Sequence, residues 1–255
     1  MKRGRLNSIR LVLITAILGL MVLTPIIQAG STNQGILSPD SPQYGLTYAE
    51  WSAKWWQWVY SISASDNPLV DKNGSNAANG QSGPVWFLAG AYCLQPCKTM
   101  ATANRNVNVP EGKALFFPIL NVESDDLNLT PPNGGSPLTY NETQLRAFNE
   151  GFMALAKNMI AEVDGVSIKN LNPGLTSPYR TISPVFTYHI PDNNIYSLFG
   201  VHLPAQDVPG VVADGVYLMV APLPIGKHII HFAGEFAGKG KILFGLNIHY
   251  TINVV

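Results

Sequence analysis

Two histidines and a glutamate in the last part of the chain have the chemistry to hold a transition metal. His231, Glu235 and His249 are odd-numbered residues of two predicted strands, 226–236 and 242–254. Because side chains alternate between the two faces of a strand, all three share a face if the strands form a regular hairpin. Two imidazoles and a carboxylate suit zinc, copper or iron. The alternative, a wet sheet surface with ordinary polar residues, is the commoner arrangement.

Oxygen-bearing side chains form two further groups that could hold calcium. Calcium prefers oxygen ligands around a turn, but neither group has the complete spacing and closing glutamate of a calcium loop. The alternative for both groups is a solvated polar loop. The residues are Asp71 and Asn73 in the stretch 71–76, and Glu123, Asp125 and Asp126 in the second group.

Four of the five tryptophans fall in one predicted helix, 48–62. Trp51, Trp55 and Trp58 lie on one side of it and form a stripe that should face the core. Trp56 and Tyr60, one turn apart, point away from that stripe. They could form an aromatic platform for a carbohydrate, a peptide or a cell-surface partner, since rigid aromatic rings are common at recognition sites. The alternative is that other elements surround the helix and bury both rings.

No catalytic motif is present in the sequence. It has no G-x-S-x-G and no H-E-x-x-H, and the stretch 234–239 lacks both the length and the Ser or Thr of a phosphate-binding loop. This favours a non-enzymatic binding or structural module. The rival is a metal-dependent enzyme that uses the two histidines and Glu235.

The two cysteines, Cys93 and Cys97, are close enough in sequence to form a disulfide if the chain turns between them. Pro96 makes such a turn plausible, and an exported chain meets oxidising conditions. A redox pair or a metal site is the alternative, but the spacing is C-x-x-x-C and no histidine stands nearby.

These residues must be positioned by a chain that is mostly β. Thr47 with Glu50, and Thr139 with Glu142, have the spacing of a helix-capping box and predict helices near 48–62 and 140–163. Asp164-Gly165 suits a tight turn between 161–163 and 166–168. The other predicted strands are 85–92, 113–120, 182–190, 214–221, 226–236 and 242–254.

Three of these strands, 85–92, 114–120 and 216–221, are apolar on both faces, so each should be covered on both sides. Such strands with only two helices predict a mainly β fold. We expect a β-sandwich, immunoglobulin-like or jelly-roll-like, with two packed α-helices. A single β-rich domain would span 46–255, after a flexible tether over 30–45.

The first 29 residues have the pattern of a signal peptide. Four basic residues precede an uncharged run of 17 residues, 11–27, and Ala29 offers a small residue for cleavage. An uncleaved membrane anchor is the alternative. The rest of the chain has 12 Lys and Arg against 16 Asp and Glu, a net charge of −4. A mildly acidic surface without a basic patch argues against nucleic acid as a partner.

From Trp51 onward the chain resembles a family of predicted secreted prokaryotic proteins of unknown function. The resembling stretches are WSAKWWQW (51–58), QSGPVWFLAG (81–90), VPEGKALFFPILNVE (109–123) and YRTISPVF (179–186), together with the terminal hairpin from Leu223. The resemblance implies export and a shared fold, and no activity.

Overall fold

The structure is a computed structural model that describes residues 35–94, 98–127 and 139–255. The predicted signal peptide and Cys97 lie outside these residues. Within them, the end of the predicted tether is bonded to the domain: Ile36 forms a bridge with Val220, and Leu37 donates a backbone hydrogen bond to Met219. No helix of the described part is long and apolar enough to cross a membrane.

Two five-stranded sheets form a β-sandwich, as predicted. The first sheet has the order β1 (Val85–Phe87), β3 (Ala114–Ser124), β8 (Gln206–Val220) and β6 (Arg180–Ile182), with β7 (Phe186–Ile190) also paired to β8. The second has the order β2 (Met100–Val109), β10 (Lys241–Val254), β9 (Gly226–Gly238), β4 (Ala156–Val163) and β5 (Val166–Ser167). The β1–β3 and β2–β10 pairs are parallel, and the others are antiparallel.

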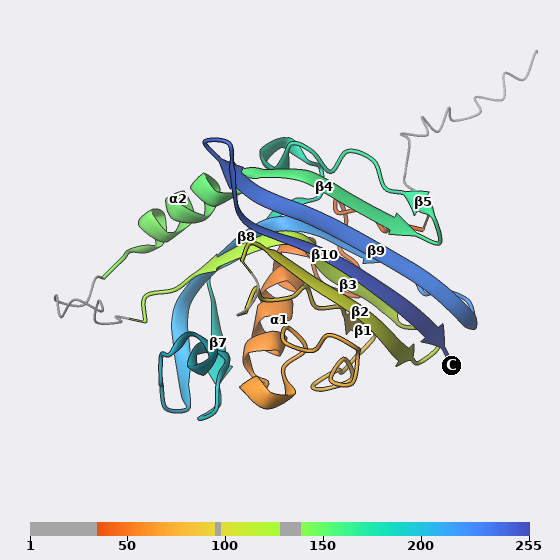
Figure 1. The fold of residues 1–255 in the computed structure, drawn as a ribbon, viewed down its shortest axis with the longest axis horizontal. Coiled ribbons are helices and arrows are strands. Elements are labelled where there is room, and N and C mark those ends of the chain that lie inside the picture. The colour runs from red at the N-terminus through yellow and green to blue at the C-terminus, as the bar shows by residue number, and fades with distance from the viewer. Residues whose placement is uncertain (1–34, 95–97, 128–138) are drawn as a thin grey trace, which may run out of the picture. The chain divides into compact units, whose positions relative to one another are not determined.

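The first sheet is covered on both faces. One face packs against the second sheet, and the opposite face packs against helix α1 (Tyr48–Tyr60) (Figure 1). Alternate residues of β3 show this directly: Phe117 lies in the core between the sheets, whereas Phe116 lies in the core beneath α1. The prediction that the strands with apolar residues on both faces are covered on both sides is confirmed, and β3 and β8 are central. Strand β1 is also covered on both faces, but it lies at the edge of the sheet.

Helix α1 begins where the capping box predicts. The Glu50 backbone N–H donates to the Thr47 hydroxyl at 3.2 Å, and the Thr47 backbone N–H donates to the Glu50 carboxylate at 2.8 Å. Both bonds satisfy N–H groups that a helix start leaves free. The helix therefore begins at a defined residue, and Trp51, Trp55 and Trp58 pack in the core that it shares with the first sheet.

The second predicted helix is wrong in length and start. Helix α2 (Glu142–Met153) is capped by Asn141 with Gln144, not by Thr139 with Glu142, and it ends ten residues early. Residues 156–163 form β4 instead. A bulge at Asn158, where φ is +53°, places buried Ala156 and Met159 three residues apart, so this strand imitates helical spacing.

The turn after β4 is confirmed. Asp164 and Gly165 both have positive φ, +51° and +77°, and Val163 pairs with Val166.

Strand β2 was not predicted, because its inward positions are mostly small or polar. Three single-turn helices complete the described fold: η1 (Ala64–Asp66), η2 (Gly174–Thr176) and η3 (Ile195–Phe199).

Candidate functional site

Two acidic side chains lie at the end of β3, where the strand leaves the sheet. Glu123 is the penultimate residue of β3, and Asp125 follows it. No ion pair of the described residues involves either carboxyl group. The Oε1 atom of Glu123 is buried and has no hydrogen-bond partner in the described structure. Buried carboxyl groups without a basic partner are costly and therefore informative.

Four tyrosines surround the two carboxyl groups. The Tyr60 hydroxyl, at the end of α1, donates to Glu123 Oε2 at 3.1 Å, and the Tyr92 hydroxyl lies 3.4 Å from that of Tyr60. Asp125 Oδ2 accepts from Tyr188 on β7 at 2.6 Å and from Tyr196 on η3 at 2.9 Å. Four separate elements thus converge on the end of β3.

The electrostatics of this cluster favour a proton on Glu123. Burial, and then the charge of nearby Asp125, raise the pKa of Glu123 well above its usual range. Burial also raises the pKa of Tyr92 to about 12, and it raises the pKa of Tyr60 well above its usual range. The four phenols therefore remain neutral donors at neutral pH.

The cluster forms one wall of an open cavity of about 650 Å³. Helix α2 and the segment before it also line this cavity, and they contribute Phe148 and Tyr140, 56% and 44% exposed. Tyr60 and Tyr196 complete an aromatic lining around Glu123 and Asp125. We call this the acidic cavity.

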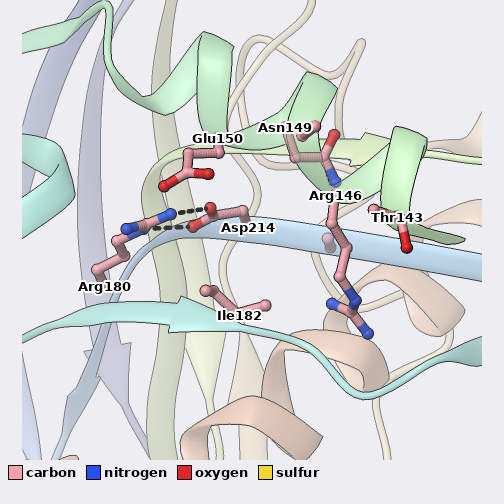
Figure 2. A pocket seen from close by; sticks show the side chains of 9 residues that line it. Thr143, Arg146, Asn149, Glu150, Arg180, Ile182 and Asp214 are labelled. Carbon is pink, nitrogen blue, oxygen red and sulfur yellow. Dashed lines mark hydrogen bonds and ion pairs between the residues drawn. The ribbon is translucent and has the colours of Figure 1, made fainter.

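A second cavity, of about 420 Å³, lies along another side of α2 (Figure 2). Arg180 on β6 and Asp214 on β8 point at each other there and form two hydrogen bonds of 3.1 and 2.7 Å. Arg146 pairs with Glu142 at 2.7 Å and also donates to the Ser183 carbonyl. Both guanidinium groups in this paired cavity already have carboxylate partners, so neither offers an unpaired positive charge to a ligand.

The predicted metal ligands are only partly brought together. His231 and His249 face outward from β9 and β10 with their rings stacked 4.0 Å apart. Glu235 is four residues further along β9, about 13 Å at the usual rise of a strand, and accepts from Asn158. The carboxylate near His231 is that of Glu162, at 3.7 Å. Among the described residues, no three His, Cys, Asp or Glu side chains are grouped for a metal ion.

The first predicted calcium group organises a loop. Oδ1 of Asp71 accepts from the backbone N–H groups of Asn73 and Gly74, and Oδ2 accepts from that of Asn76. Asn73 in turn accepts from the Ser75 backbone. In the second group Glu123 and Asp125 share one site, whereas Asp126 accepts from the Tyr140 backbone.

The predicted aromatic platform is not on the surface. Trp56 and Tyr60 are 6% and 5% exposed, because β7, η3 and the end of β3 cover the side of α1 that faces away from the tryptophan stripe. Tyr60 nevertheless lines the acidic cavity and bonds Glu123. The sequence did not identify Tyr188, Tyr196, Tyr140 or Phe148, which have no mutual spacing to reveal them.

Comparisons of the chain with protein-family models, with curated proteins and with solved structures find no match. The resemblance to secreted prokaryotic proteins therefore stays a prediction, as does the disulfide between Cys93 and Cys97, since Cys97 is outside the described residues. The site must be interpreted from its own chemistry.

Proposed function

We propose that this protein is an exported, non-enzymatic binding module whose ligand carries a protonated amine. The observation that carries the proposal is the buried, unpartnered Oε1 of Glu123 in the wall of an aromatic-lined cavity. An N⁺–H donor is the complement of this free oxygen, because the charge of a bound cation favours the ionised form of Glu123. Aromatic faces also attract organic cations. The predicted signal peptide supports a place outside the cytoplasm.

The acids are arranged for holding a cation rather than for hydrolysis. Asp125 Oδ1 accepts from the backbone of Leu127, and its Oδ2 accepts from two tyrosines, so both oxygens are engaged. Reactions that use two carboxyl groups require both to reach the substrate or a water molecule. Here Glu123 alone has a free oxygen, which supports binding over catalysis. With Glu235 distant from both histidines, no observation supports the metal-dependent alternative.

Isothermal titration with benzylamine and benzyl alcohol tests the proposal. The two molecules have the same ring and similar size, and only the amine is charged at pH 8. We expect benzylamine to bind and benzyl alcohol to bind at least tenfold more weakly. Glu123→Gln should weaken benzylamine about 10- to 100-fold, the range of a hydrogen bond to a charged group.

Glu150→Gln is the matched control. Glu150 lies on α2, which borders both cavities, but it lines only the paired cavity. It should leave the affinity for benzylamine unchanged. Equal affinities for amine and alcohol, or an equal loss in both variants, would overturn the proposal.

A further inference from the structure

A third cavity, of about 340 Å³, adjoins the acidic cavity and is lined mainly by apolar side chains. It lies where the end of the sandwich meets α1 and η3, and Trp56 is part of its wall. We call it the apolar cavity. Its other apolar lining residues include Leu120, Val122, Phe152, Phe199, Phe244 and Leu246.

Three elements each place neighbouring residues in both cavities. Strand β3 gives Val122 to the apolar cavity and Glu123 to the acidic one. Helix α2 gives Phe152 and, one turn earlier, Phe148, whose rings lie 4.9 Å apart. Element η3 gives Phe199 and Tyr196 in the same way.

The boundary between the cavities is one layer of side chains. Tyr60 lines the acidic cavity and Tyr92 lines the apolar one, and their hydroxyl oxygens are 3.4 Å apart. At the surface above this boundary, Phe148 and Phe199 are both more than half exposed. Exposed aromatic rings that continue from one cavity to the next indicate a single extended binding surface.

We propose that the two cavities bind one amphiphilic ligand, a long-chain amine. Its ammonium group pairs with Glu123, and its hydrocarbon chain lies across Phe148 and Phe199 into the apolar cavity. This inference rests on the proposed function and adds the class of ligand. The hydrocarbon assignment follows from the lining and from its continuity with the cation site, since burying apolar surface favours an apolar guest.

A series of n-alkylamines from butylamine to octylamine, titrated below their micelle concentrations, tests this inference. Each methylene that enters the apolar cavity should tighten Kd about three- to fourfold. Octylamine has four more methylenes than butylamine and should therefore bind roughly 80- to 250-fold more tightly. A Kd independent of chain length, with butylamine still bound, would overturn the inference and leave the proposed function intact. Failure of every amine to bind would instead overturn the proposed function.

Two variants check the position of the chain. Val122→Phe should fill part of the apolar cavity and weaken octylamine at least fivefold while leaving butylamine unchanged. Val166→Phe, on the exposed β4–β5 hairpin, is the control and should change neither. Phe199→Ser removes an exposed ring without touching the core, so it tests the same point should Val122→Phe fail to fold. Equal effects on both amines would contradict the assignment.

Discussion

The paired cavity and the acidic cavity lie on two sides of α2, and Ala147 lines both. Their acids are neighbours in the first sheet. Asp214 on β8 is in register with Val122, and the next pair along is Glu123 with Ala213. Asp214 and Glu123 therefore lie almost side by side in the sheet. Because successive residues of a strand alternate between its two faces, their side chains point to opposite faces of the sheet. One meets Arg180, and the other meets only tyrosines.

This difference separates a structural carboxylate from a candidate ligand-binding one. Asp214 has exchanged its hydration for two hydrogen bonds from a guanidinium group, and Arg180 has a raised pKa through the hydrogen bond with Asp214. Glu123 has one hydroxyl partner and a raised pKa through burial. A protein gains nothing in stability from burying an uncompensated acid. Among the described residues no cation pairs with Glu123, and this points to function.

Breaking the Arg180–Asp214 pair should have the largest effect on stability. The side chains are 16% and 4% exposed, so Asp214→Asn leaves a mostly buried guanidinium without its counter-charge. We expect the free energy of unfolding to fall by about 3 kcal/mol. Urea denaturation monitored by tryptophan fluorescence measures it. The double variant Arg180→Met with Asp214→Asn should recover most of the loss, and a double variant as unstable as the single one would contradict this account.

Glu123→Gln should raise the free energy of unfolding, whereas Asp214→Asn should lower it. The size of the gain should depend on pH. The pKa of Glu123 is raised in the folded state above the ordinary value of 4.5. Between those two pKa values the folded protein binds more protons than the unfolded chain, so wild-type stability contributed by Glu123 is lost as pH rises. Glu123→Gln does not lose this stability as the pH rises. The difference in free energy of unfolding between the variant and the wild type should therefore grow by up to about 1.4 kcal/mol per pH unit.

Urea denaturation of both proteins from pH 5 to pH 8 measures this advantage. Glu150→Gln, in the paired cavity, is the control variant measured over the same pH range. If the stability gained by Glu123→Gln does not change with pH, Glu123 is ionised throughout this range, and the distinction between the cavities is removed.

The fold was predictable where side chains obey a simple period. The alternation along β9 and β10 and the capping box of α1 gave correct strands, faces and helix start. Strand β2 was missed because its inward position 105 is an arginine, 2% exposed, whose five N–H groups all donate to oxygen atoms. The guanidinium group is satisfied by four carbonyls and the Tyr250 hydroxyl, an arrangement that only the folded chain reveals.

The candidate site was predictable only in part. The sequence singled out Glu123 and Asp125 as possible calcium ligands and Tyr60 as part of an aromatic platform. It did not predict that the three residues share one site. Their combination depends on β7 and η3, which come at least 61 residues after Asp125 and bring Tyr188 and Tyr196 to it. Helical rotation placed Tyr60 off the tryptophan stripe correctly, yet it could not show that other elements cover that side.

Removing one tyrosine hydroxyl should have a smaller effect. Tyr196→Phe takes from Asp125 one of its two phenol donors, and a hydrogen bond to a charged group contributes about 1.5–3 kcal/mol. The neighbouring Tyr188 keeps its bond of 2.6 Å, so we expect a loss of about 1 kcal/mol in thermal or urea denaturation. Tyr140→Phe is the control, since that side chain is 44% exposed, and it should change stability by less than about 0.5 kcal/mol. Equal losses would mean that Asp125 does not depend on its phenols.

The smallest effect should come from Glu142→Gln, which removes the carboxylate partner of Arg146 in the paired cavity. Glu142 and Arg146 are four residues apart on α2 with side chains 55% and 29% exposed, so water already screens their attraction. Arg146 also keeps its bond to the Ser183 carbonyl at 3.1 Å. We expect a loss of about 0.5 kcal/mol in urea denaturation at low salt, including the interaction of Glu142 with the helix dipole. In 1 M salt the loss should vanish, whereas that of Asp214→Asn should persist, because salt screens exposed pairs far more than buried ones. A loss from Glu142→Gln that matches that of Asp214→Asn would show that the whole paired cavity is one coupled network, and that burial does not distinguish its two ion pairs.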